Sequence, residues 1–188
     1  MVFNMDPGAA RHWCGESVVK ARQIPPVARD WLFDNGSLTR RLKLLCGEQF
    51  CVNLLDENRA RTYLDEAQMM GVCSGEQARV RRVLLCSGDR PLVYARTVIP
   101  LSSLQGAARR LAHLGERPLG AVLFANKGAR RGAVQVCEAS AQSLNPILPE
   151  GIVWGRRSVF YLAEKPLLVS EFFLPSLFEL IACRDERV

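Results

Sequence analysis

Hydrophobic and polar residues follow a strand-like pattern over residues 165–175, which read KPLLVSEFFLP. At a period of two, Leu167, Val169 and Phe173 fall on one face of a β-strand, and the opposite face is also mostly apolar. Glu171 shares the first face with these three residues. Because a lone buried carboxylate is costly, we expect Glu171 to be ion-paired, to be protonated, or to line a cavity.

The same pattern of residues occurs twice, at 81–100 (RRVLLCSGDRPLVYARTVIP) and at 156–175 (RRSVFYLAEKPLLVSEFFLP). Both segments begin with two arginines, contain an acidic–basic–proline turn, and end on a proline nine residues after the first proline. Their apolar runs are rich in Val, Leu, Ile, Phe and Tyr, so each segment predicts a β-hairpin. The repeat indicates a duplicated unit, in which Arg96 takes the position that Glu171 has in the second copy.

Helical periodicity appears between the hairpins, with polar residues at the expected helix starts. Predicted helices begin at Ser37, at Ser102 or Ser103, and at Pro118, with another over 57–70; further strands are predicted over 49–55 and 134–138. Repeated helix-then-hairpin units predict an α+β fold. We expect a single antiparallel sheet with internal duplication, helices covering one face, and a buried ligand pocket.

Two opposite charges stand alone among aliphatic residues, one in each hairpin: Arg81 and Glu171. One interpretation is a structural ion pair, because folding the second hairpin brings Glu171 opposite Arg156 or Arg157. The other is a closed pocket with an arginine at one end and a carboxylate at the other, which suits a small elongated anion. Both interpretations stay open on periodicity alone.

Two predicted helix starts supply further donors for such a pocket. A helix that begins at Pro118 leaves the N–H of Leu119 without an intrahelical partner, so this group is free to donate to a ligand. Leu38, directly after the predicted cap Ser37, offers a second donor of the same kind.

The 188 residues, 48% of them hydrophobic, are enough for one well-packed core. We expect a single domain over 1–188, with its core at about 25–175 and an extension at each end. No run reaches the roughly 18 apolar residues of a membrane helix, and the N-terminus lacks the apolar region of a signal peptide.

The seven cysteines contain no C-x-x-C pair, a pattern that favours reduced thiols in the cytoplasm over disulfides or a metal site. The net charge of +6 comes from arginines that are spread along the chain without alternating aromatic residues. We therefore expect a cytoplasmic protein with no nucleic-acid partner, and a monomer by default.

The motifs resemble the chorismate lyase family. The resemblance lies in six blocks, DWLFDNGSLTRR (30–41), RRVLLC (81–86), ARTVIP (95–100), LGERPLGAVLF (114–124), WGRRS (154–158) and KPLLVSEFFLP (165–175). They follow in order from about Trp31 to Pro175, whereas residues 56–77 depart from the family pattern. Members of this family have an antiparallel sheet with an internal duplication, as the repeat also predicts.

The resemblance implies a cofactor-independent lyase that converts chorismate to 4-hydroxybenzoate and pyruvate, the first committed step of ubiquinone biosynthesis. It implies catalytic roles for Arg81 and Glu171, and substrate and product binding by these two residues, Leu119 and Leu38, the last through its backbone. Arg157, Arg156 and Arg41 are candidates for holding the second carboxylate of chorismate. The alternatives are a small-anion sensor domain on the same scaffold, and a chorismate-using relative with a different product.

Overall fold

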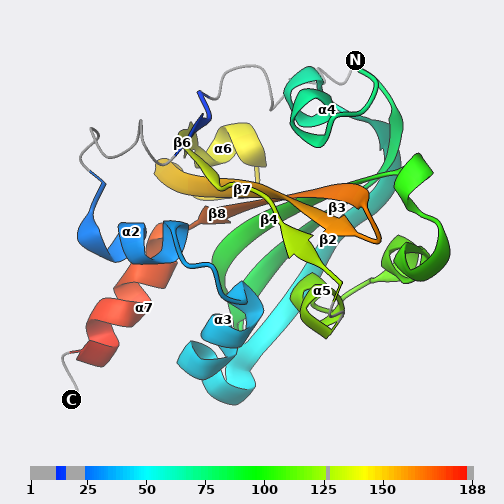
Figure 1. Ribbon diagram of the computed structural model, residues 1–188. Coiled ribbons are helices and arrows are strands. Elements are labelled where there is room, and N and C mark those ends of the chain that lie inside the picture. Colours follow the sequence, from blue (N-terminus) through cyan, green and yellow to red (C-terminus); the bar gives the residue numbers. More distant parts are fainter. Residues whose placement is uncertain (1–11, 16–23, 126–127, 186–188) are drawn as a thin grey trace.

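The computed structural model describes residues 12–15, 24–125 and 128–185, and within these ranges eight strands form one antiparallel sheet (Figure 1). The strands are β1 (Cys14–Gly15), β2 (Phe50–Arg61), β3 (Gln77–Ser87), β4 (Arg90–Pro100), β5 (Arg130–Arg131), β6 (Gln135–Ser140), β7 (Ile152–Leu162) and β8 (Lys165–Phe173). Their order is β1-β6-β7-β8-β4-β3-β2, and β5 pairs with β7. The predicted α+β class and single antiparallel sheet are confirmed.

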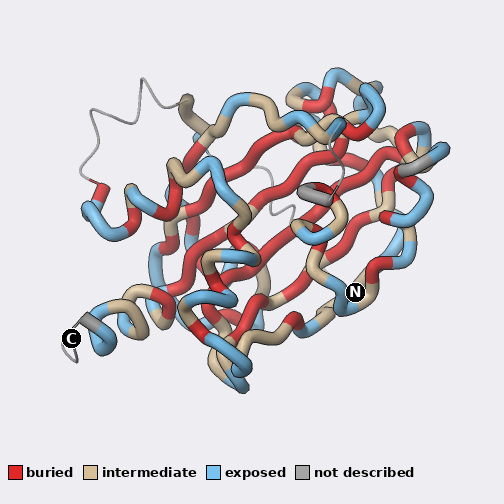
Figure 2. The backbone as a smooth tube through the Cα atoms, turned by 60° about the horizontal axis from the view of Figure 1, so that its bottom comes forward, coloured by how far each residue is buried: buried red, intermediate tan, exposed pale blue. Residues whose placement is uncertain are grey.

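Helices lie on both faces of this sheet. They are α2 (Pro26–Leu32), α3 (Leu38–Cys46), α4 (Leu64–Met70), α5 (Leu119–Ala125), α6 (Ala141–Leu144) and α7 (Pro175–Asp185), with 3₁₀ turns η1 (Gly47–Gln49), η2 (Leu101–Ser103) and η3 (Gly106–His113). Helices α2, α3, α5 and α7 cover one face, and α4 and α6 lie on the opposite face, whereas helices were expected on one face only (Figure 1). The central strands between these layers are buried along most of their length (Figure 2).

The two predicted hairpins are the pairs β3–β4 and β7–β8, and β4 also pairs with β8. The duplicated units therefore lie side by side at the centre of the sheet. In the second hairpin Ala163 and Glu164 have φ of 49° and 59°. This left-handed conformation at both central residues is what a tight two-residue hairpin turn requires.

A β-bulge beside Cys86 makes the first hairpin different from the second. The bulge shifts the pairing of β3 with β4 by one residue, so Arg81 lies opposite Thr97. The second hairpin has no such shift, and Arg156 lies opposite Glu171 as the ion-pair interpretation predicts. Because side chains alternate between faces, the one-residue shift changes which side chains of β4 face the same way as Arg81.

The opposite face of the sheet carries its own ion pairs. Arg96, which the sequence repeat aligns with Glu171, turns to this face and donates from Nε and Nη2 to the two carboxylate oxygens of Glu66, at 2.8 and 3.1 Å. Arg157 on β7 donates to Asp65 at 2.5 Å. Both carboxylates belong to α4, so these pairs attach α4 to the sheet.

Two helix starts agree with the sequence analysis. The Oγ of Ser37 caps α3 by accepting the N–H of Arg40 at 3.3 Å. Helix α5 begins at Leu119, one residue after the predicted start at Pro118. The strands expected over 49–55 and 134–138 correspond to β2 and β6.

Two other expectations were wrong. A helix was expected over 57–70, but β2 continues to Arg61 because residues 56–61 pair with β3, and α4 forms only afterwards. No α-helix starts at Ser102 or Ser103 in the described chain; this region forms the 3₁₀ turns η2 and η3. Gly106, the first residue of η3, has a left-handed φ of 54°, which prevents one continuous helix from running through both turns.

The segment from Pro175 forms α7, and its Leu177 is fully buried in the core cluster that also contains residues of α2 and α3. Most of the predicted N-terminal extension lies outside the described residues. No helix in the described part of the chain is long and apolar enough to cross a lipid bilayer.

Candidate functional site

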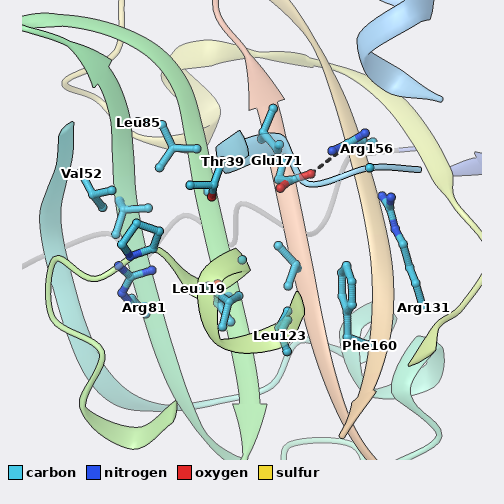
Figure 3. Close-up of a pocket in the computed structure, with 18 residues that line it drawn as sticks. Thr39, Val52, Arg81, Leu85, Leu119, Leu123, Arg131, Arg156, Phe160 and Glu171 are labelled. Atoms are coloured by element: carbon cyan, nitrogen blue, oxygen red, sulfur yellow. Dashed lines mark hydrogen bonds and ion pairs between the residues drawn. The ribbon is translucent and has the colours of Figure 1, made fainter. Parts of the chain in front are cut away.

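A pocket of about 600 Å³, including its opening to solvent, lies between the sheet and the first turns of α3 and α5 (Figure 3). Its apolar surface comes from Leu38, Val52, Val83, Leu85, Ala95, Pro118, Leu119, Leu123, Phe160 and Val169. Its polar side chains are Thr39, Arg81, Thr97, Arg131, Arg156 and Glu171. The four residues that the sequence analysis selected, Arg81, Glu171, Leu119 and Leu38, all line this one pocket.

Arg81 is held on β3 by neutral acceptors. Its guanidinium donates from Nε and Nη2 to the carbonyl of Gly115, at 3.0 and 2.7 Å, and from Nη2 to the carbonyl of Arg117, at 3.0 Å. Nη1 makes no hydrogen bond with any described residue. Glu57, directly across on β2, forms its ion pair with Arg79 instead, at 3.6 Å.

Burial makes the positive charge of Arg81 less favourable, but the guanidinium stays protonated. Only 3% of the residue is exposed, and this burial lowers its pKa, while the nearby charge of Glu57 acts in the opposite direction. A guanidinium stays protonated in proteins even when buried. Arg81 is therefore a desolvated cation with a free donor, which is the condition under which it binds an anion strongly.

Glu171 both forms an ion pair and faces the pocket, so the two interpretations of this residue are realised together. Arg156 donates from Nε to one oxygen of Glu171 at 2.6 Å. The Nη1 of Arg156 donates to the carbonyls of Trp31 and Asp34, at 2.8 and 2.7 Å. The Glu171 side chain is 17% exposed, and its second oxygen has no hydrogen-bond partner among the described residues.

Arg131 lines the pocket, although the sequence analysis did not select it. Its Nε donates to the Oγ of Ser158 at 3.0 Å, and its Nη1 donates to the carbonyl of Asp34 at 3.1 Å. Burial, followed by the charge of Arg156, lowers the pKa of Arg131. Its only signal in the sequence is the Arg130–Arg131 pair, because β5 is too short to show periodicity.

Two of the arginines proposed for a second carboxylate lie away from the pocket. Arg157 projects from the opposite face of the sheet, where it contacts Asp65 and the side chain of Gln135. Arg41 bonds to Asp34 and stacks over Trp31 at 3.8 Å, outside the pocket lining. Of the three candidates, only Arg156 lines the pocket.

The first turns of α3 and α5 meet at the pocket. A Cβ at Gly120 would lie 3.0 Å from the Oγ1 of Thr39 and 3.3 Å from the Oγ of Ser37, so glycine allows this close approach. The approach places Leu38 and Leu119, the first residues of the two helices, on the pocket surface. Backbone N–H groups in a first turn have no intrahelical acceptor and are available to a ligand.

The pocket carries a surplus of positive charge. Three arginines and one carboxylate line it among the described residues, which gives a formal charge of 3 − 1 = +2. The remaining lining is almost entirely apolar. This combination suits a small, largely apolar molecule with two negative charges, and it disfavours cations.

A family model and several related proteins all point to the same protein family. Residues 13–182 match the family model described as "Chorismate lyase". A "Probable chorismate pyruvate-lyase" of Methylococcus capsulatus is 47% identical over 78% of this chain and 94% of that protein. A protein with the same description from Pseudomonas aeruginosa is 41% identical over 86% of this chain and 91% of that protein. Another, from Pseudomonas putida, is 37% identical over 99% of each chain.

Solved structures share the fold at low sequence identity. The C-terminal domain of PhnF superposes with a TM-score of 0.55 at 15% identity, covering 71% of this chain and 88% of that one. A GntR-family transcriptional regulator from Bacillus cereus gives 0.50 at 12% identity, covering 68% and 93%. These two show the fold alone, whereas the family model and the three relatives show that the chain belongs to the chorismate lyase family.

Proposed function

We propose that this protein is a chorismate pyruvate-lyase, which converts chorismate to 4-hydroxybenzoate and pyruvate in the pocket described above. The observation that carries the proposal is the +2 lining of a small apolar pocket, because chorismate is a compact dianion. The names of the relatives support the same reaction. In this proposal the product enters ubiquinone biosynthesis.

Arg81 binds the ring carboxylate in this account, because its Nη1 is a free donor on a buried cation. The N–H of Leu119 assists at the same carboxylate, and the N–H of Leu38 is the second backbone donor. Glu171 then meets the ring hydroxyl, which chorismate and 4-hydroxybenzoate share. Arg156 holds Glu171 in this orientation at 2.6 Å.

The chemical step needs no external redox partner. The bond between the ring carbon and the enolpyruvyl oxygen breaks, and the ring carbon that bears the hydroxyl loses its hydrogen as a proton. A proton is added to the enolpyruvyl methylene, which gives pyruvate, and the ring becomes aromatic. Glu171 either accepts the ring proton or polarises the hydroxyl, and a fixed electrostatic environment stabilises the charge that develops.

A second candidate function is a binding domain that senses a hydroxybenzoate-like anion without turning it over. The observation that favours it is the shared fold with a GntR-family transcriptional regulator. We also infer a cytoplasmic location, for which the seven free cysteines are supporting evidence, and a monomeric state. Light scattering of the purified protein tests the monomer.

The proposed function is tested by incubating the purified protein with chorismate. Pyruvate is measured by coupling to lactate dehydrogenase, and the aromatic product is identified by chromatography against authentic hydroxybenzoates. We expect equal amounts of pyruvate and 4-hydroxybenzoate. Tight 4-hydroxybenzoate binding without turnover would favour the sensor, and a different aromatic product would identify a relative with another specificity.

A further inference from the structure

Arg131 and Arg81 lie at opposite ends of the pocket. In strand order they are separated by β4, β8 and β7, which is four strand spacings or roughly 19 Å between backbones. Figure 3 shows the two side chains on opposite sides of Glu171. The pocket therefore has a cation near each end and a carboxylate between them.

The partners of these arginines distinguish them from Arg156. Arg156 is neutralised by Glu171 at 2.6 Å, whereas the hydrogen bonds of Arg131 go to a hydroxyl and a backbone carbonyl, which are neutral. Arg131 forms no ion pair with a described carboxylate, and its Nη2 has no described hydrogen-bond partner. Arg81 likewise forms no ion pair with a described carboxylate, and its free donor is Nη1, because Nε and Nη2 donate to backbone carbonyls. Two unneutralised cations thus match the two carboxylates of a dianion.

We propose that Arg131 binds the enolpyruvyl carboxylate, and that it thereby distinguishes the substrate from the aromatic product. This inference rests on the proposed function. Chorismate carries one carboxylate on the ring and one on the enolpyruvyl group, whereas 4-hydroxybenzoate keeps only the ring carboxylate. With Arg81 on the ring carboxylate, the free Nη2 of Arg131 is the donor left for the second carboxylate. The ring centre of Phe160 lies 5.4 Å from the guanidinium carbon of Arg131.

Arg131 also has a structural role, and the test must distinguish this role from binding of the enolpyruvyl carboxylate. It shares the carbonyl of Asp34 with Arg156, and both arginines thereby support the loop that leads into α3. A purely structural Arg131 would alter the position of Leu38, so its loss would weaken substrate and product binding together. If Arg131 binds the enolpyruvyl carboxylate, its loss weakens substrate binding and leaves product binding unchanged.

The test compares Arg131→Gln with Arg131→Lys and with the matched control Arg130→Gln. Arg130 is the exposed neighbour that pairs with Glu164. For each variant, kcat and KM are measured with chorismate, and Kd is measured with 4-hydroxybenzoate by calorimetry. We expect Arg131→Gln to raise the KM for chorismate roughly 10- to 100-fold, with less than about a twofold change in the Kd for 4-hydroxybenzoate.

Arg131→Lys should restore part of the loss, because it restores the charge, and Arg130→Gln should behave as wild type. If Arg131→Gln weakened the binding of both ligands equally, or left the KM for chorismate unchanged, the inference would be overturned. Absence of pyruvate release by the wild type would overturn the proposed function instead. In that case the Kd values for chorismate and 4-hydroxybenzoate in the same variants still decide the role of Arg131.

Discussion

Arg81 and Arg156 begin the two copies of the duplicated hairpin, yet their guanidinium groups have different partners. Arg156 lies opposite Glu171 and pairs with it, so the second hairpin carries a neutral pair into the pocket. Arg81 lies opposite Thr97 and is held by the carbonyls of Gly115 and Arg117. The first hairpin therefore brings an unneutralised cation to the same pocket.

The cause of this difference is the β-bulge beside Cys86. Without the shift, β4 would present Arg96 on the pocket face, where the second copy presents Glu171. With the shift, Arg96 turns to the opposite face and pairs with Glu66. One residue of register thus separates the pocket face of the sheet from the face that carries α4, because side chains alternate along a strand.

The largest expected effect is on stability, at the opposite face. Replacing Glu66 by alanine leaves Arg96, which is 6% exposed, without its carboxylate partner. We expect the free energy of unfolding to fall by about 3–5 kcal/mol, measured by urea denaturation. The control Glu179→Ala removes the exposed pair with Arg90, and its expected cost is below about 1 kcal/mol. An equal loss of unfolding free energy in the two variants would contradict the structural role of the Arg96–Glu66 pair.

The next effect is on binding, at Arg81. Arg81→Ala should weaken 4-hydroxybenzoate binding by about 2–5 kcal/mol, because the ring carboxylate loses a buried cation. Calorimetry measures the affinity, and Arg82→Ala is the matched control, since Arg82 pairs with Asp56 outside the pocket lining. Wild-type affinity in Arg81→Ala would remove Arg81 from the site.

Glu171→Gln should affect turnover more than stability. The amide oxygen can still accept the Nε–H of Arg156, so the fold is retained, but the amide cannot take up a proton or carry a negative charge. We expect kcat for chorismate to fall about 100-fold with little change in Tm. Retained activity together with a sharply lowered Tm would mean that Glu171 is only half of a structural ion pair.

The smallest effect is the pH dependence contributed by Cys86, at the bulge itself. Burial raises the pKa of Cys86 from its ordinary 9.0 to about 12. Above about pH 9 the unfolded chain ionises this thiol while the folded chain keeps its proton, so stability falls as the pH rises toward 12. Urea denaturation at pH 8 and pH 10 should show a shallower decline for Cys86→Ala than for wild type. Identical declines would show that Cys86 does not titrate differently on folding.

Much of the fold could be predicted because the duplicated hairpins carry strong local signals. The Arg pairs, the turns and the closing prolines locate β3, β4, β7 and β8 without knowledge of tertiary contacts. Ser37 likewise marks the start of α3. The bulge beside Cys86 could not be predicted, since it leaves the residue pattern of β3 unchanged and appears only in the pairing with β4.

In the candidate site, too, some residues could be predicted from local sequence signals and others could not. Arg81 and Glu171 were found because each is a single charge on an apolar strand face, and strand periodicity makes such a charge visible. Arg131 was missed because β5 has two residues and belongs to the sheet only through its pairing with β7. The segment over 57–61 was assigned to a helix because its strand character depends on pairing with β3.

The most direct test of the account is a crystal structure of the protein with 4-hydroxybenzoate. We predict that the ligand carboxylate lies about 2.7–3.2 Å from the free Nη1 of Arg81, with the phenolic oxygen directed toward Glu171. A ligand bound in the reverse orientation, or one that leaves Arg81 without an anionic partner, would contradict the central claim that the unneutralised arginine of the first hairpin is the anion-binding group.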